Sequence, residues 1–306
     1  MRRYFHLFLT LFFCLSLAAV HAQDESKFSK EDYSERFIEE LAFEILNAEN
    51  DEKRVMGNQQ LIETLEEELN KEGAFSYPFT AVKSLGILTS PDSMIRIFNW
   101  NIPLDDGTYA YGAFVLKAEE DGEYKLIQLH AIDTDTIDLD AFIGNKNHWP
   151  SALYYELIQK KAYNRTYYFL LAWDGHNRLT NRKWIDVFWF NKEGELQVGA
   201  PIFKNKNNPG IHRVVFRYAS QNKMGLSYRK DLDRIEFDHL SPPRSSLKGI
   251  YEYYGADFSH DAYYWKGNYW EYKPTIDIEE GIKKRKKDFI IEEGVIKEQQ
   301  PIYEPN

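Results

Sequence analysis

Cysteine is almost missing from this chain. The single example, Cys14, lies in an apolar segment near the N-terminus. If that segment is removed as an export leader, the remaining chain has no thiol. Disulfides, zinc–thiolate sites, iron–sulfur clusters and cysteine nucleophiles are then excluded. A chain of 306 residues can bury enough apolar surface to fold without such cross-links.

Several catalytic and nucleotide-binding motifs are missing as well. The sequence contains no G-x-S-x-G, no phosphate-binding loop and no G-x-G-x-x-G. Its histidines show no H-x-H or H-x-x-x-H spacing. This absence does not exclude a zinc site whose ligands come from distant positions in the sequence. We therefore assign no catalytic residue. Beyond residue 22, the scattered histidines are His130, His148, His176, His212, His239 and His260.

Long apolar runs are limited to one, at residues 7–20, which follows a charged start. Small residues at Val20 and Ala22 complete the pattern of a signal peptide over residues 1–22, so we expect a mature chain beginning at Gln23. We predict an exported protein, periplasmic or secreted. The run is shorter than the roughly 20 residues that span a bilayer, so no stable transmembrane segment is expected after cleavage.

Negative charge dominates. The formal charge of −10 becomes −12 when the two arginines of the leader are removed, which argues against nucleic acid or anionic lipid as a partner. The basic run "KKRKK" (283–287) lies in a charged C-terminal tail, residues 277–306. Nearby glutamates favour a solvated face over an anion-binding patch.

Helical periodicity appears in two places. Apolar residues recur at helical spacing between residues 30 and 72, which predicts an N-terminal helical hairpin (23–75) packed on the main domain. The segment "WPSALYYELIQKK" (149–161) has Pro150 in its first turn and leucines along one side. We predict one inserted helix there.

The remainder, residues 76–276, alternates between short β-rich runs and turn residues. Asp106-Gly107, Glu193-Gly194, Gln221-Asn222-Lys223 and Gly267 separate such runs and predict hairpins. The fold class is therefore mainly β, an antiparallel meander or sandwich-like domain. Because the hairpins recur loosely, an irregular propeller is the alternative.

One predicted hairpin runs from Phe169 to Phe190. Both faces of its two strands are apolar, which is typical of strands buried on both sides. The polar loop between them holds Asp174, His176 and Asn177. We interpret these residues as the corner of the hairpin, because Asp, Gly and Asn supply turn geometry.

Three segments together carry a resemblance. "RIFNWNIPLDDGTYAYGAFV", "HWPSALYYELIQ" and "LLAWDGHNRLTNRKWIDVFWF" resemble a group of uncharacterised secreted or envelope proteins of Bacteroidota-type bacteria, over roughly residues 30–275. The resemblance implies an envelope or secreted location and brings no catalytic residue. The hairpin motif of this group maps onto Trp173, Asp174, Gly175, Thr180, Asn181 and Lys183. Its turn motif maps onto Asp106–Tyr109.

The acidic run "DTDTIDLD" is a candidate metal loop. Ca²⁺ takes six to eight oxygen ligands from such flexible loops. The run lacks the glycine and terminal glutamate of an EF-hand, so an ordinary solvated loop is the alternative. No other cofactor is expected. The candidate calcium ligands are Asp133, Asp135, Asp138 and Asp140.

Aromatic residues make up 16% of the chain, with 21 tyrosines. Residues 249–273 are especially rich in them, and the two-residue period of a strand points half of them away from the core. Outward Tyr and Trp rings stack on sugars or anchor a protein partner; ordinary β packing is the alternative. The candidate ligand-binding residues are Tyr263, Trp265, Trp270, Trp173 and Asp174.

These observations lead to three functional hypotheses. The first is a non-catalytic exported envelope protein whose aromatic β face binds a glycan or a protein. The second is a polysaccharide or cell-wall hydrolase, which requires Asp174 and Asp186, or Glu252 and Asp257, to converge at about 5–10 Å. The third is an accessory subunit of an envelope complex.

Overall fold

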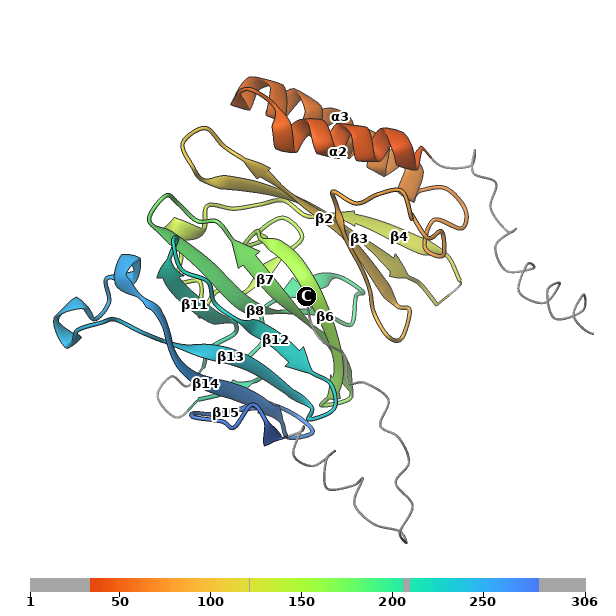
Figure 1. Ribbon diagram of the computed structural model, residues 1–306. Helices are drawn as coiled ribbons and strands as arrows, with labels where there is room; N and C mark the ends of the chain where they lie inside the picture. Colours follow the sequence, from red (N-terminus) through yellow and green to blue (C-terminus); the bar gives the residue numbers. More distant parts are fainter. Residues whose placement is uncertain (1–33, 121, 206–209, 281–306) are drawn as a thin grey trace, which may run out of the picture.

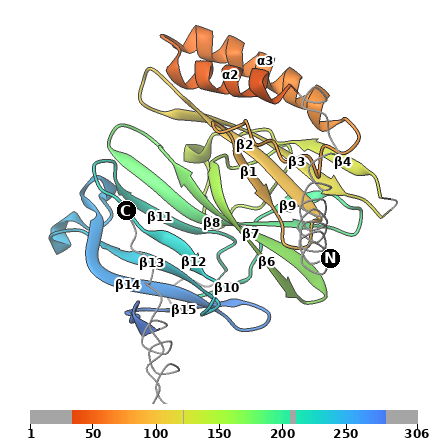
Figure 2. The same ribbon diagram turned by 45° about the vertical axis from the view of Figure 1, so that its right-hand side comes forward.

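A computed structural model describes residues 34–120, 122–205 and 210–280 of the chain (Figure 1). The predicted leader and all but the first four residues of the charged tail lie outside these ranges. The described part is a stack of four layers, a helix pair followed by three β-sheets, and Figure 2 shows the same order from a second direction. The prediction of a mainly β fold with an N-terminal helical hairpin is confirmed.

The helix pair packs on a four-stranded antiparallel sheet. Alternation along β2 divides its side chains: Phe98 and Trp100 face the helices, while Ile95 and Ile97 face the next sheet. The first two layers are α2 (Glu35–Asn47), α3 (Asp51–Leu69), β1 (Gly86–Thr89), β2 (Ile95–Pro103), β3 (Tyr109–Ala118) and β4 (Tyr124–Gln128). No helix of the described residues is long and apolar enough to cross a membrane.

The six-stranded sheet in the middle is buried on both faces. On β7, Phe169 and Leu171 face one neighbouring sheet, while Leu170 and Ala172 face the other. The predicted doubly buried hairpin is therefore confirmed, and Asn177 holds its corner by accepting hydrogen bonds from Leu179 N and Thr180 N. The strands are β5 (Gly144–Asn145), β6 (Leu153–Ala162), β7 (Arg165–Asp174), β8 (Thr180–Phe190), β9 (Leu196–Val198) and β11 (Val214–Ala219).

The predicted helix at 149–161 is wrong, because residues 153–162 form β6 and pair with β7. Its apolar residues occupy both strand faces, since the sheet is buried on both sides. A doubly buried strand and a helical stripe share this apolar pattern, so periodicity could not separate them.

The third sheet is five-stranded and mixed, with one parallel pair, β10–β15. Hairpins are confirmed at Asp106-Gly107, Glu193-Gly194 and Gly267, and the described residues form no propeller. The hairpin predicted at 221–223 is wrong, because β11 joins β8 whereas β12 joins β13. This sheet comprises β10 (Phe203–Lys204), β12 (Leu226–Arg229), β13 (Arg234–Ser241), β14 (Gly255–Trp265) and β15 (Trp270–Lys273), and a short helix, η3 (Tyr251–Tyr253), precedes β14.

Candidate functional site

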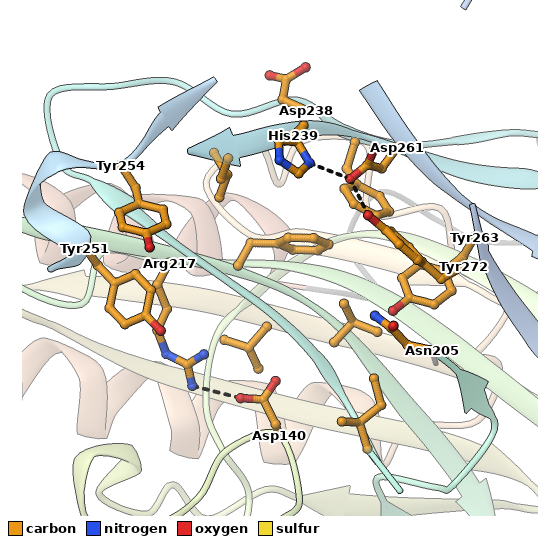
Figure 3. Close-up of a pocket in the computed structure, with 16 residues that line it drawn as sticks. Asp140, Asn205, Arg217, Asp238, His239, Tyr251, Tyr254, Asp261, Tyr263 and Tyr272 are labelled. Carbon is orange, nitrogen blue, oxygen red and sulfur yellow. Dashed lines mark hydrogen bonds and ion pairs between the residues drawn. The ribbon is translucent and has the colours of Figure 1, made fainter. Parts of the chain in front are cut away.

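A cavity of about 280 Å³ lies between β11 of the middle sheet and β13 of the last sheet (Figure 3). Its floor is apolar and includes Val214, Phe216 and Phe237. We call it the tyrosine cavity. Its polar and tyrosine lining residues are Asp140, Asn205, Arg217, Asp238, His239, Tyr251, Tyr254, Asp261, Tyr263 and Tyr272.

One wall of the tyrosine cavity centres on Asp261, which is 3% exposed. Its Oδ2 atom lies 2.8 Å from His239 Nδ1 and accepts a hydrogen bond from the Tyr272 hydroxyl at 2.7 Å. Thr275 N donates to the other oxygen at 2.9 Å. Burial, then the neighbouring Asp261, raises the pKa of Tyr272, so its hydroxyl stays protonated. The carboxylate thus fixes two side chains that face the cavity.

His239 owes its position to a β-bulge. Asp238 pairs with His260 and Leu240 pairs with Ala256, so three residues of β14 lie opposite His239 alone. The imidazole side chain remains 43% exposed although its Nδ1 atom is bound to Asp261. Nε2 therefore stays accessible for exchange of a proton or a hydrogen bond with a ligand.

The opposite wall presents a charge pair and two tyrosines. Arg217 lies 3.1 Å from Asp140, and its guanidinium lies 5.7 Å from the centre of the Tyr251 ring. The Tyr251 and Tyr254 rings are 5.1 Å apart. Because both members of the ion pair are about one-quarter exposed, they remain available to a ligand. Figure 3 shows these groups across the apolar floor from Tyr263 and Tyr272.

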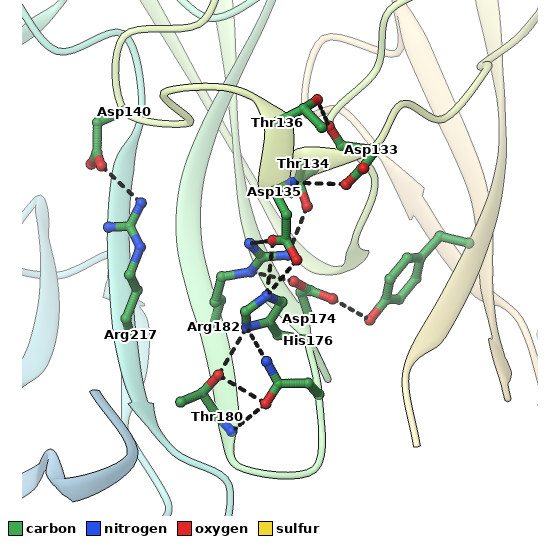
Figure 4. Close-up of polar contacts among 12 residues, drawn as sticks. Asp133, Thr134, Asp135, Thr136, Asp140, Asp174, His176, Thr180, Arg182 and Arg217 are labelled. Carbon is green, nitrogen blue, oxygen red and sulfur yellow. Dashed lines mark hydrogen bonds and ion pairs between the residues drawn. The ribbon is translucent and has the colours of Figure 1, made fainter. Parts of the chain in front are cut away.

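A second cavity, of about 260 Å³, adjoins the first and shares Arg217 and Tyr251 with it. Figure 4 shows the network along its wall, which we call the polar network. Arg182 donates to Asp174 at 2.6 Å and to Asp135 at 3.0 Å. His176 Nε2 lies 2.9 Å from the same Asp135 carboxylate.

The polar network fixes the ionisation of Asp135. Partial burial acts to raise the pKa of this carboxyl, but the charges and hydrogen bonds of His176 and Arg182 lower it below its ordinary value. The Tyr111 hydroxyl donates to Asp174 at 2.9 Å, and burial and this carboxylate raise its pKa. The network therefore connects the loop before β5 to the β7–β8 corner through Asp135.

The candidate calcium ligands do not converge. Asp133 caps a short helix by accepting from Asp135 N, Asp135 binds His176 and Arg182, and Asp140 binds Arg217. Asp138 is exposed. In the described part of the chain, no three His, Asp or Glu side chains are grouped as a metal would require. Two of the four carboxylates, Asp135 and Asp140, are thus bound to different arginines.

The candidate aromatic ligands are mostly packed inside. Trp270 is fully buried, with its ring 5.5 Å from Phe169 and 5.2 Å from Trp265, so the prediction that it forms an exposed binding face is wrong. Trp265 is half-buried in the same core cluster. The middle sheet covers the face of β14 and β15 that we expected to be open. Tyr263 is 2% exposed and contributes to the cavity wall.

The remaining candidate residues are tied into the fold. Trp173 is half-buried, with its ring 5.2 Å from Tyr109, and Asp174 is buried against Arg182. Asp186 is fully buried, accepts from Arg213 Nε at 2.9 Å and lies four positions along β8 from the partner of Asp174, about 13 Å away. This separation exceeds that of a catalytic carboxylate pair.

Glu252 and Asp257 are the other acidic pair considered. Glu252 lies half-buried in η3, whereas Asp257 is exposed in the β14 bulge and accepts a hydrogen bond from Ser259 N. A hydrogen bond from Ser259 lowers the pKa of Asp257 despite slight burial. Neither residue lines the tyrosine cavity.

The chain matches no protein-family model, no curated protein and no solved structure. Functional interpretation therefore rests on the geometry of its own residues. Sequence reasoning missed His239, Asp261, Tyr272 and Arg217 as a group. The strand pattern "FDHLS" and "SHDAYY" offered a weak signal, since each places a His beside an Asp.

Chemically, the tyrosine cavity combines an apolar floor, aromatic edges and paired charges. Such a surface suits a ligand that presents C–H faces and several hydroxyl groups at once. Asp140 and Asp261 accept hydrogen bonds and Arg217 supplies donors, while the Tyr272 hydroxyl, which already donates to Asp261, can only accept one. The arrangement also holds one accessible imidazole for proton transfer.

Proposed function

We propose that this protein is an exported envelope protein that binds a glycan in the tyrosine cavity. One observation carries the proposal: a solvent-accessible cavity places His239, Asp261 and Tyr272 across an apolar floor from Arg217, Asp140 and Tyr251. Sugars present hydroxyl groups to such paired charges and C–H faces to such rings. Export is inferred from the apolar leader and from the resemblance to secreted and envelope proteins of Bacteroidota-type bacteria.

The proposal predicts that saturable binding depends on the cavity. Mature protein, residues 23–306, is screened against polysaccharides and cell-wall fragments by tryptophan fluorescence and titration calorimetry. The Arg217→Met variant should weaken binding about tenfold or more, because it removes a charged donor and a ring-stacked side chain.

Arg165→Met is the matched control. Its guanidinium also stacks on an aromatic ring, 4.0 Å from the centre of Trp189, but it lies outside the cavity. The control variant should bind like the unchanged protein. Binding that is equally weakened by both substitutions, or by neither, would contradict the assignment of the cavity.

A glycan hydrolase is the second candidate, supported by the His239–Asp261 pair. A buried carboxylate that orients an accessible imidazole is the arrangement of a general base. The expected outcome is release of reducing ends from the bound polysaccharide, slowed about 100-fold or more in His239→Asn. Binding without any release of reducing ends in the unchanged protein would leave the non-catalytic proposal standing alone.

A further inference from the structure

Among the described residues, Arg96 is the buried arginine without an acidic partner. Arg182, Arg213 and Arg234 are buried to a similar degree, and each lies within 3.0 Å of an aspartate or glutamate oxygen. Arg96 is 6% exposed, and no carboxylate lies within 4.0 Å of it in the described part of the chain. A buried charge without a counter-ion is costly to the fold.

The contacts of Arg96 only partly offset this cost. Nη1 donates to the carbonyl oxygens of Ala74, Phe75 and Tyr77 at 3.3, 2.8 and 2.6 Å. The guanidinium also lies beside the rings of Phe79 and Phe98, 5.3 and 5.1 Å from their centres. Nε is buried and has no hydrogen-bond partner. Donor capacity therefore remains unused.

A cavity of about 360 Å³ opens beside this guanidinium. It is bounded by the 75–78 turn, the β1–β2 corner and Tyr124. The hydroxyl groups of Ser76 and Ser93 line it, and neither makes a hydrogen bond within the described residues. Tyr124 stacks on Phe75 at 4.6 Å and forms an aromatic edge. The cavity thus offers a buried cation, open hydroxyl donors and a ring.

We propose that Arg96, Ser76 and Ser93 form a binding site for the oxyanion of a small molecule, a carboxylate, sulfate or phosphate group. Such an anion supplies the negative charge that no described carboxylate provides beside Arg96. It also accepts hydrogen bonds from a guanidinium and from hydroxyls. The cavity is larger than an oxyanion alone, which leaves room for an organic part against Tyr124.

Burial lowers the pKa of Arg96 to about 10, as expected of a cation held without a carboxylate. At neutral pH the guanidinium remains charged. The site is separate from the tyrosine cavity and shares no lining residue with it. Its occupancy therefore does not depend on the proposed glycan function.

The test uses the mature chain with sulfate, inorganic phosphate, butyrate and benzoate as probes. Thermal unfolding and titration calorimetry measure binding. Because sulfate and phosphate stabilise proteins in general, the comparison between variants decides the result. Preference for benzoate over butyrate would assign the organic part to the Tyr124 edge, and equal binding of all four would assign the oxyanion alone.

Ser93→Gly and Ser76→Ala should each weaken binding about tenfold, and Arg96→Lys more. The serine variants keep the test decisive if Arg96 variants fail to fold. Ser227→Ala is the matched control, since Ser227 is an exposed serine outside the cavity whose hydroxyl makes no hydrogen bond with the residues that the structure describes. No saturable binding by any probe, or equal binding by the serine variants and the control, would overturn the proposal.

Discussion

Phe258 combines a left-handed backbone, φ +69°, with a side chain that is 94% exposed. Neither property helps the fold, because a bulky residue at positive φ is strained and an exposed ring buries nothing. The residue lies in the β14 bulge opposite His239. The strain is thus stored beside the candidate site, and the exposed ring is available to a partner.

Phe258→Gly should therefore stabilise the protein. Glycine adopts positive φ without strain, and the gain should be about 1 kcal/mol, or a rise in Tm of about 2–4 °C. Thermal unfolding followed by circular dichroism measures it. Phe258→Ala removes the ring but keeps Cβ, so it should gain less; an equal gain would show that the ring, not the backbone, carries the cost.

Ionisation of Glu156 should change the stability of the fold with pH in the opposite direction to ionisation of Asp135. Burial raises the pKa of Glu156 above 4.5, although a hydrogen bond from Tyr228 N acts against the rise. The folded chain therefore holds this proton more tightly than the unfolded chain. At neutral pH the Glu156 carboxyl is ionised, and burying its charge lowers the stability of the fold. Below about pH 4.5 the carboxyl is protonated in both the folded and the unfolded chain, and this loss of stability disappears.

Glu156→Gln should accordingly raise Tm at neutral pH and leave it unchanged near pH 4. Asp135→Asn is the comparison, since its lowered pKa stabilises the fold above the ordinary value of 3.8 and that stability is lost as the pH falls through the folded-state pKa. It should lower Tm at neutral pH. Effects of one sign, or effects independent of pH, would contradict this assignment.

At the scale of single residues, the sequence predicted which positions are polar or apolar better than it predicted which residues contact one another. In the sequence, Asp186 is a single polar residue within an apolar strand, and nothing there indicates its partner. In the structure it is fully buried against Arg213, which lies on another segment. The site at His239 needed a bulge at Phe258, and phenylalanine gives no sign of positive φ. These pairings arise from tertiary register, which local pattern does not encode.

Strands rather than single residues explain what was predicted correctly. β7 and β8 are apolar at both parities, and this continuous pattern indicated burial on both faces before the neighbouring sheets were known. The same property misled the reading of β6, where Leu157 and Ile158 face opposite sheets. Turn residues identified hairpins but could not reveal that β11 and β12 join different sheets.

The middle sheet also contains a buried ion pair whose loss should be severe. Asp186 accepts from Arg213 at 2.9 Å and from the Tyr154 hydroxyl at 2.7 Å, with both charged side chains fully buried. Asp186→Ala leaves the guanidinium without a counter-ion. We expect a loss of about 3–5 kcal/mol, measured by urea unfolding.

Asp231→Ala provides the control for that substitution. Its pairing with Arg229 at 3.2 Å lies near the surface, where ion pairs contribute about 0–1 kcal/mol. The two substitutions should therefore differ several-fold in their effect on the free energy of unfolding. A small loss in Asp186→Ala would show that the buried arginine finds another partner after the aspartate is removed.

At the scale of the whole fold, the described residues form three separate apolar cores between the four layers. Composition and length predicted a large mainly β fold, but not the stacking of three sheets. Each outer sheet shares a core with the middle sheet. The proposed oxyanion site lies between the turn that follows α3 and the β1–β2 corner, whereas the tyrosine cavity lies between the middle and last sheets.

The parallel pair of β10 and β15 has a consequence for the order in which the protein is made. Phe203 pairs with Trp270, and Tyr272 supplies part of the cavity wall. A growing chain therefore cannot complete the cavity until β15 has been synthesised. Such long-range pairing also slows folding, because distant segments must lose conformational entropy in coming together before their contacts stabilise the chain. The tyrosine cavity is thus complete only after this strand near the C-terminal end of the described chain has been made.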